Sequence, residues 1–173
     1  MCIRSSDGAG YAPGDLSGTR TVVFAGVSST DYHQLLLKQS DNVEPYQSTG
    51  MAHSVLTNRV SYLLNLKGPS RPFDTACSSS LIALHEAVES IRRGECDTAL
   101  AGGVSLMFSP MVYLAFAKAG MLAPDGRCKA FDEAADGYVR GEGVGVVLLK
   151  SLSAAGRDGD AIYAVVRGSS ENH

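Results

Sequence analysis

The chain has 173 residues, enough for one domain with its own core, and its 45% hydrophobic and 19% charged residues are typical of a globular protein. The net charge of -3, with acidic and basic residues mixed along the chain, argues against nucleic acid as a partner. No apolar run is long enough to span a bilayer and no apolar stretch follows Arg4, so the sequence predicts no membrane segment, no secretory signal and a cytoplasmic location.

The first third of the chain predicts one strand and two helices. Residues 1–19 are rich in Gly, Ser, Asp and Pro and are expected to be irregular. The β-branched run Thr21–Val27 predicts a buried strand, and Asp31–Gln39 a short helix. Ser54–Lys67 has a helical period with Ser54 as its expected N-cap. The residues on its apolar face are Leu56, Val60, Leu63 and Leu64.

The middle of the chain contains the strongest helical pattern. A short extended segment, Pro72–Ala76, leads to Cys77, and the helix is predicted over Leu81–Arg93, before the stop signal Gly94. Its apolar stripe consists of Leu81, Leu84, Val88 and Ile91, widened by Ile82. The apolar run Asp97–Phe108 is interrupted by two glycines and suits a central strand with close backbone contacts.

The last third continues the alternation of helices and strands. Ser109 and Pro110 predict the N-cap and first residue of a helix that ends at Gly120. A buried strand, a turn and a further strand are predicted at Gly143–Lys150, Arg157–Asp160 and Ala161–Val166. This alternation predicts an α/β fold whose sheet is covered on both faces.

Cys77 is the residue in this pattern that can carry chemistry. Its neighbours in Asp74–Ser80 are small, as a sharp strand-to-helix turn requires if a nucleophile is to project from it. The free N–H groups and positive dipole end of the following helix stabilise a thiolate and can receive an oxyanion. The alternative is a buried cysteine at the start of a core helix, with Ser78–Ser80 competing to cap it. The residues alone leave both interpretations open.

A thiolate nucleophile also needs a nearby base or acid. His85 lies eight residues further along the same helix, about 12 Å away along its axis, so it is predicted to be a helix-face residue. His33 and His53 belong to other segments and could meet Cys77 only through the fold, and His173 has no readable role. The sequence therefore identifies a candidate nucleophile without its partner.

Metal and nucleotide sites are not predicted. The four cysteines form no CxxC pair and lie at no zinc-finger spacing from a histidine, which argues against a structural zinc site and a disulfide framework. Gly137–Gly145 superficially resembles a phosphate loop, but it lacks the Lys-Ser/Thr pair and a strand follows where a helix should. A structured turn is the better interpretation of this glycine-rich segment.

Several motifs together resemble a known family. Gly68-Pro-Ser70 and Asp74-Thr-Ala-Cys-Ser-Ser-Ser80 resemble the active-site signature of β-ketoacyl synthases (ketosynthases) of modular polyketide synthases. The similarity continues through Ala9–Pro13, Val23–Ser29, Gly94–Asp97, Ala101–Val104, Met121–Gly126, Phe131-Asp132 and Gly137–Gly143. It covers essentially the whole chain. Gly50–Arg59 and Ser170–His173 are most similar to ketosynthases of trans-acyltransferase systems.

The resemblance implies a thiolase-like fold with layered αβαβα architecture. Residues 1–173 would be a partial N-terminal domain, truncated at both ends, with only the N-terminal half of that fold largely present. It implies a homodimer in which the extended segment before Cys77 pairs across the two-fold axis. It also implies an acyl carrier protein as partner and other polyketide synthase domains in the same chain.

The resemblance further implies an acyltransferase mechanism. Cys77 accepts an acyl chain from a phosphopantetheine thioester, its backbone N–H forms part of the oxyanion hole, and decarboxylated malonyl thioester then attacks to give a β-ketoacyl product. No metal or cofactor is expected. Phe108 and Met111 are expected in the core or, alternatively, lining an acyl tunnel.

The family's two catalytic histidines lie in His-Gly-Thr-Gly-Thr and Asn-Ile-Gly-His segments that do not occur in residues 1–173. Activity is therefore expected only in the full-length parent. The alternatives are a non-catalytic dimerising fragment and a thioester hydrolase that uses Cys77.

Overall fold

The computed structural model describes residues 2–5, 10–39 and 44–172 and forms two compact units. Unit 1 comprises Met1–Ser28, Pro45–Val104 and Val144–His173, and unit 2 comprises Ser29–Glu44 and Ser105–Gly143. The irregular structure expected for residues 6–9 and the position of His173 lie outside the described residues.

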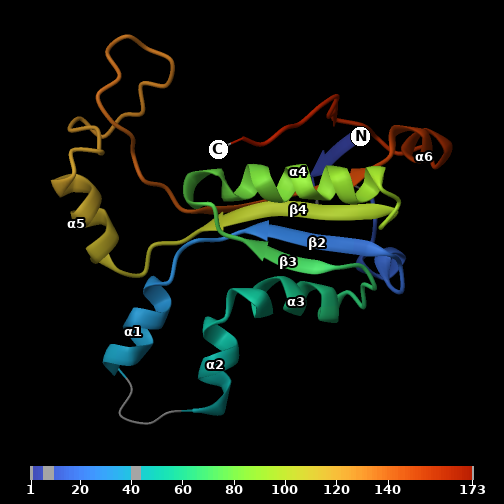
Figure 1. Ribbon diagram of the computed structural model, residues 1–173, viewed down its shortest axis with the longest axis horizontal. Coiled ribbons are helices and arrows are strands. Elements are labelled where there is room, and N and C mark those ends of the chain that lie inside the picture. The colour runs from blue at the N-terminus through green and yellow to red at the C-terminus, as the bar shows by residue number, and fades with distance from the viewer. Residues whose placement is uncertain (1, 6–9, 40–43, 173) are drawn as a thin grey trace. The chain divides into compact units, whose positions relative to one another are not determined.

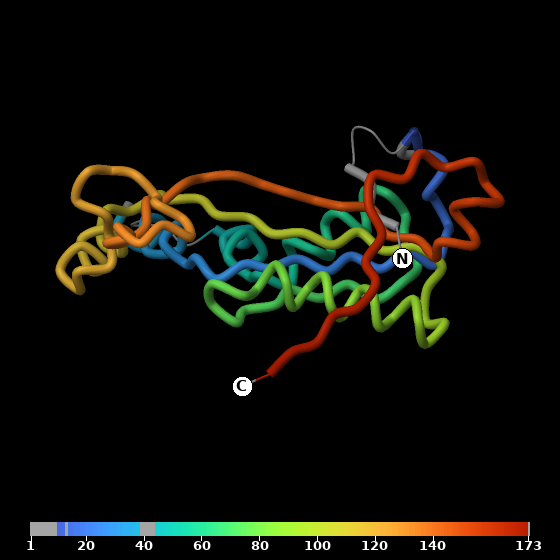
Figure 2. Tube along the Cα trace, turned by 90° about the horizontal axis from the view of Figure 1, so that it is seen from above, coloured from blue at the N-terminus to red at the C-terminus, as the bar shows by residue number. Residues whose placement is uncertain are grey.

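Unit 1 is built on a sheet with the strand order β3-β2-β4-β5-β1-β6 (Figure 1). β2 pairs in parallel with β3 and β4, whereas β1 pairs antiparallel with β5 and β6. The strands are β1 Cys2–Ser5, β2 Thr21–Gly26, β3 Ser70–Phe73, β4 Thr98–Ser105, β5 Gly143–Lys150 and β6 Ala164–Val165. In Figure 2 the blue trace of β2 and the yellow-green trace of β4 run side by side.

Helices cover both faces of this sheet, with α4 on one face and α3 on the other (Figure 1). The helical elements of unit 1 are η1 Pro13–Leu16, α2 Pro45–Met51, α3 His53–Leu63, η2 Ala76–Ser78, α4 Ser79–Arg92 and α6 Leu152–Arg157. The predicted α/β class is therefore confirmed.

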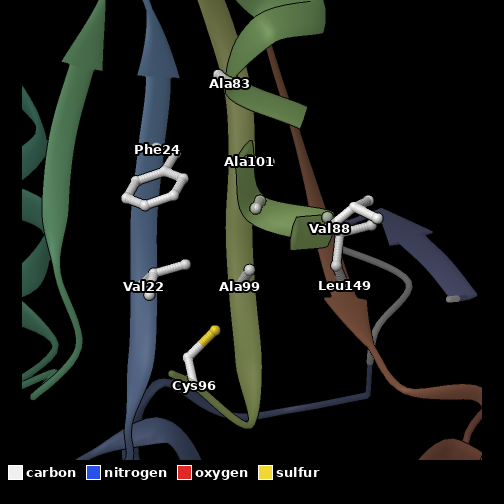
Figure 3. Packing of buried hydrophobic residues seen from close by; sticks show 9 residues of the cluster. Val22, Phe24, Ala83, Val88, Cys96, Ala99, Ala101 and Leu149 are labelled. Atoms are coloured by element: carbon white, nitrogen blue, oxygen red, sulfur yellow. The ribbon is translucent and has the colours of Figure 1, made fainter. Parts of the chain in front are cut away.

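The main core lies between the sheet and α4. Alternation along β2 turns Val22 and Phe24 toward α4, where they pack with Ala83 and Val88 (Figure 3). Val23 points to the opposite face and packs with residues that flank the strand and α3. The partners of Val23 there are Leu16 and Leu66. Small side chains on α4 allow the helix to approach the strands closely.

A buried ion cluster ties the start of unit 1 to its end. The Lys150 ammonium donates to Tyr11 Oη at 2.9 Å, to Asp160 at 3.1 Å and to Asp158. Tyr11 also donates to Asp160 at 3.0 Å. Burial by itself lowers the pKa of Lys150, but these hydrogen bonds outweigh it and the pKa is raised, so the ammonium stays charged.

Unit 2 contains two helices and a loop held by one strand-like bridge. The helices are α1 Asp31–Gln39 and α5 Pro110–Lys118. Both were predicted, and the Ser109 side chain caps α5 by accepting from Met111 N–H at 3.3 Å. The turn predicted for Gly137–Gly145 is not found: Tyr138 forms a bridge with Leu122, and β5 already begins at Gly143. Gly137 packs too closely against Leu122 and Ala123 for any side chain.

Several predictions about burial were wrong. α3 begins after Ala52, so Ser54 is not its N-cap as expected. The helix buries Thr57. Residues of its predicted apolar face are exposed because none of the described residues of unit 1 covers them. The exposed residues of that face are Leu56, Val60 and Leu63. On α4, Leu81 is exposed and small residues are buried in its place. β5 has its predicted bounds but is buried only over its last residues.

Several elements were missed and two were overestimated. β1 and η1 lie in the segment expected to be irregular, and α2, α6 and η2 were not predicted. The extended segment expected over Pro72–Ala76 ends with β3 at Phe73. For α6 a signal existed: Ser151 caps the helix by accepting from Ala154 N–H at 3.2 Å. The strand expected over Ala161–Val166 shortens to Ala164–Val165, which pairs with only part of β1.

Candidate active site

Cys77 lies at the point where the chain leaves the sheet and enters α4. β3 ends at Phe73, the single turn η2 contains the cysteine, and α4 begins two residues later at Ser79. Cys77 is exposed and has a free thiol. This is the strand-to-helix position predicted from the sequence, and the competing interpretation of a buried cysteine is wrong.

The residue before Cys77 has an unusual backbone. Ala76 has φ +54°, in the left-handed region that residues with a Cβ rarely adopt. Such a conformation costs of order 1–3 kcal/mol and persists only where the surrounding structure imposes it. The turn that presents Cys77 is therefore held under backbone strain.

Hydroxyl groups hold this turn. Ser79 Oγ accepts from Thr75 N–H at 2.9 Å and donates to the Ala76 carbonyl at 2.6 Å. Ser78 Oγ donates to the Thr75 carbonyl at 2.8 Å. Ala76 N–H donates to Asp74 at 3.2 Å. Of the serines expected to compete for the helix cap, Ser78 and Ser79 instead bind the backbone of the turn itself.

Two glycines allow the start of α4 to lie against the sheet. A Cβ at Gly26, the last residue of β2, would stand 2.4 Å from Ser80 N and 2.8 Å from Ser79 Cβ. A Cβ at Gly103 in β4 would stand 2.7 Å from Ser80 Cβ. All three distances are shorter than real Cβ contacts, so only glycine fits at either position. Gly103 of the predicted central strand is thus explained by close helix–sheet contact, whereas its neighbour Gly102 lies against the backbone of Gly145 and Val146 in β5.

The other described cysteines have different surroundings. Cys96 is part of the core, and burial, followed by the nearby carboxylates of Asp97 and Glu95, raises its pKa to about 11, so it stays a thiol at neutral pH. Cys128 is exposed in unit 2, where its sulfur accepts from Val139 N–H at 3.1 Å. Cys77 alone among these three stands at the entry to a long helix.

In unit 2, Asp31 fixes the start of α5. Its carboxylate accepts from Phe108 N–H at 2.7 Å and from Ser109 N–H at 3.1 Å, and it also accepts from Ser29 Oγ. Burial by itself raises the pKa of Asp31, but these three hydrogen bonds outweigh it and the pKa is lowered. The Tyr32 ring packs on Phe108 with centroids 5.3 Å apart.

Phe108, but not Met111, lines an apolar groove on unit 2. The groove has a volume of about 320 Å³. Its lining residues are Met107, Phe108, Ser109, Pro110, Tyr113 and Leu114. Phe108 is 48% exposed and Met111, one residue beyond Pro110, is 56% exposed, so the expectation that they are core residues is wrong. The groove is lined partly by the segment before α5, which carries Phe108, and partly by Tyr113 and Leu114 of α5 itself.

Comparison with known proteins decides the family. The family described as "Beta-ketoacyl synthase, N-terminal domain" matches residues 5–155. A phenolphthiocerol/phthiocerol polyketide synthase protein of Mycobacterium tuberculosis is 54% identical over 164 residues, which is 95% of this chain. Polyketide synthase PksN of Bacillus subtilis is 51% identical over 170 residues, which is 98% of this chain. This chain belongs to the β-ketoacyl synthase family.

Solved ketosynthases share its fold. The ketosynthase from module 6 of the bacillaene synthase of Bacillus subtilis matches 91% of this chain with a TM-score of 0.79 and 43% identity. An oxazolomycin ketosynthase domain from Streptomyces albus matches 92% with a TM-score of 0.79 and 44% identity. The thiolase-like fold expected from the resemblance is therefore confirmed.

The ketosynthase chain spans a small part of these relatives. It covers 11% of the mycobacterial protein, 3% of PksN, 26% of the bacillaene ketosynthase and 28% of the oxazolomycin ketosynthase. The relatives are large polyketide synthase proteins, consistent with the expectation of further domains. Among the described residues, no helix is long and apolar enough to cross a bilayer.

The histidines of this ketosynthase segment give Cys77 no partner from its own helix. His85 lies on α4 and its Nδ1 hydrogen bonds with Ser169 Oγ at 2.8 Å, as expected for a helix-face residue. Candidate ligand atoms of His85, Glu86 and Glu171 lie within 4.8 Å of one another. Glu171 is exposed, and exposed acidic groups are common without a bound metal, so this group is not assigned as a metal site.

Proposed function

We propose that this chain is part of the N-terminal domain of a β-ketoacyl-[acyl carrier protein] synthase and that Cys77 is its acyl-accepting nucleophile. The observation that carries the proposal is the exposed thiol on a strained turn directly before α4. Strain at a turn that presents a reactive group is a recurrent feature of catalytic sites. Family membership supplies the reaction class.

The first step is acyl transfer. The Cys77 thiolate attacks the carbonyl carbon of an acyl-phosphopantetheine thioester, and the Cys77 N–H donates to the oxyanion. The new C–S bond forms as the bond to the carrier thiol breaks, and that thiol leaves with the proton that Cys77 lost.

The second step is condensation. A malonyl thioester loses carbon dioxide, its carbanion forms a C–C bond to the acyl carbon, and the Cys77 thiolate leaves. The product is a β-ketoacyl thioester longer by two carbons. The general acid–base groups for this step must come from histidines outside residues 1–173, and the proposed enzyme uses no metal or cofactor.

The partners follow from the same proposal. Acyl carrier protein supplies both substrates, and Phe108 and Met111, two exposed apolar side chains, are proposed to contact the acyl chain. β3 stands at the end of the strand order. The Phe73 carbonyl of β3 accepts from Val27 N–H, which follows β2. Because successive residues of a strand direct their backbone N–H and C=O groups to opposite edges, the backbone groups of Ser70 and Pro72 face away from β2. This edge is the proposed pairing surface of a homodimer.

The test is acylation of Cys77→Ala and Cys128→Ala variants of the complete ketosynthase by an acyl-pantetheine thioester, followed by mass spectrometry. We expect a stable acyl adduct on the wild type and on Cys128→Ala, the matched exposed-cysteine control, and none on Cys77→Ala. Turnover to free acid would instead indicate a thioester hydrolase. Absence of any adduct on the wild type would indicate a non-catalytic dimerising protein.

A further inference from the structure

Ser79 differs from every residue around it in the turn. Residues 74–78 and Ser80 are exposed, whereas Ser79 is only 6% exposed. Its hydroxyl makes two hydrogen bonds, one as acceptor from Thr75 N–H and one as donor to the Ala76 carbonyl. Because water has little access, solvent cannot replace these bonds if the hydroxyl is lost.

The two bonds of Ser79 close the Thr75–Ala76 segment from both ends. One holds the N–H at the start of the segment and the other holds the carbonyl that follows the strained Ala76. The backbone N–H of Ser79 also donates to the Ala76 carbonyl. Ser79 is thus the buried residue that holds the left-handed Ala76, whose N–H also donates to the exposed Asp74, and the next residue along the chain is Cys77.

Ser79 is itself fixed against the sheet. Its Cβ and carbonyl carbon occupy the space next to Gly26. A Cβ added to Gly26 would lie 2.8 Å from the Ser79 Cβ and 2.5 Å from the Ser79 carbonyl carbon. The hydroxyl is therefore anchored to β2, which lies in the most buried part of the sheet. Ser78 also binds the Thr75 carbonyl, but it is exposed and water can take its place.

We propose that Ser79 is a positioning residue that holds Ala76 in its left-handed conformation and thereby aims the Cys77 sulfur at the incoming thioester. The inference rests on the proposed function of Cys77. Reaction rates depend steeply on such alignment, and a displacement of about 1 Å can lower a rate by up to ~100-fold. Ser79 touches no reacting atom in this proposal and acts only through the backbone of the turn.

The test compares Ser79→Ala with Ser80→Ala in the complete ketosynthase. Both variants remove one hydroxyl from adjacent residues at the start of α4, and Ser80→Ala keeps the Cβ that packs on Gly103. Single-turnover acylation of Cys77 by an acyl-pantetheine thioester is measured over a range of thioester concentrations. We expect Ser79→Ala to lower the limiting rate at least ~10-fold with an unchanged half-saturating concentration. Ser80→Ala should stay within about twofold of the wild type.

A second variant separates positioning from loss of fold. Glycine adopts a positive φ without strain, so Ala76→Gly removes the conformational cost that Ser79 opposes. In the Ala76→Gly background, Ser79→Ala should slow acylation much less than it does in the wild type, a non-additive double-mutant cycle. If the Ser79→Ala variant alone folds poorly, the Ala76→Gly/Ser79→Ala double variant, which lacks the strain at residue 76, can still be assayed.

The outcomes distinguish the two proposals. If the wild type forms no adduct on Cys77, the proposed function fails and this inference fails with it. If the wild type is acylated but Ser79→Ala reacts as fast as Ser80→Ala, the positioning role of Ser79 alone is overturned. Equal slowing by Ser79→Ala in both backgrounds would also overturn it.

Discussion

α4 and α5 are both apolar helices that begin after a serine-containing turn, yet they are held in different ways. α4 buries Ala83, Ala87 and Val88 completely against β2 and β4. In the part of the chain that the structure describes, α5 buries none of its side chains, although its sequence is the more apolar of the two. Its start is held instead by the Asp31 carboxylate.

This difference shows that apolar composition predicts a helix better than it predicts a core. What makes α4 a core helix is the match of its small residues to Gly26 and Gly103, which lets backbone approach backbone. α5 carries large side chains over an apolar groove and is fixed by polar bonds at one end. The following predictions test that contrast, and all refer to the complete ketosynthase.

The largest effect is expected from truncating a core leucine. Leu149→Ala removes a fully buried side chain packed against α4 and should lower the free energy of unfolding by about 2–5 kcal/mol in chemical denaturation. Leu114→Ala, on the groove side of α5, is the matched change and should cost less than about 1 kcal/mol. Equal losses would show that α5 is packed as tightly as α4.

The second effect comes from adding a methyl group at the helix–sheet contact. Gly26→Ala places a Cβ against backbone atoms of Ser79 and Ser80 that cannot move freely, and we expect a loss of about 3 kcal/mol. Gly50→Ala in α2 meets no atom within 4 Å and should be neutral or stabilising by up to about 1 kcal/mol. A neutral Gly26→Ala variant would disprove the close contact.

The smallest effect concerns the polar attachment of α5. Asp31→Asn keeps one acceptor oxygen but removes the charge. This change should lower the free energy of unfolding by about 1.5 kcal/mol at pH 7. The pKa of Asp31 is lowered in the folded state. The contribution of its charge to the free energy of unfolding is therefore complete above the unfolded-state pKa of ~3.9 and is lost as the pH falls through the folded-state pKa. The stability difference between wild type and variant should therefore be constant from about pH 5 to 8 and shrink below about pH 4. A difference that stays constant as the pH is lowered further and further below about 4 would contradict this assignment.

The sequence predicted the strand-to-helix position of Cys77 because small residues before a strong helical pattern constrain the backbone locally. It also predicted α1 to the residue and the Ser109 cap of α5, since both depend on local signals. The role of Ser79 was invisible, because three consecutive serines look alike until one is buried. The exposed face of α3 was mispredicted since periodicity shows which residues share a face, not what covers it. The trans-acyltransferase subtype stays a prediction.

The ion cluster of Tyr11, Lys150 and Asp160 has a consequence for how the chain is made. Tyr11 leaves the ribosome long before its partners, which follow 139 and 149 residues later. β2, β3, α4 and β4 lie within residues 21–105 and can pair as soon as they emerge. Closing the cluster needs a loop of far greater length and is entropically slower. Tyr11 can pack on Leu16, Val23 and Leu66 early, but its ion cluster closes only after β5 and the segment that carries Asp160 have been synthesised.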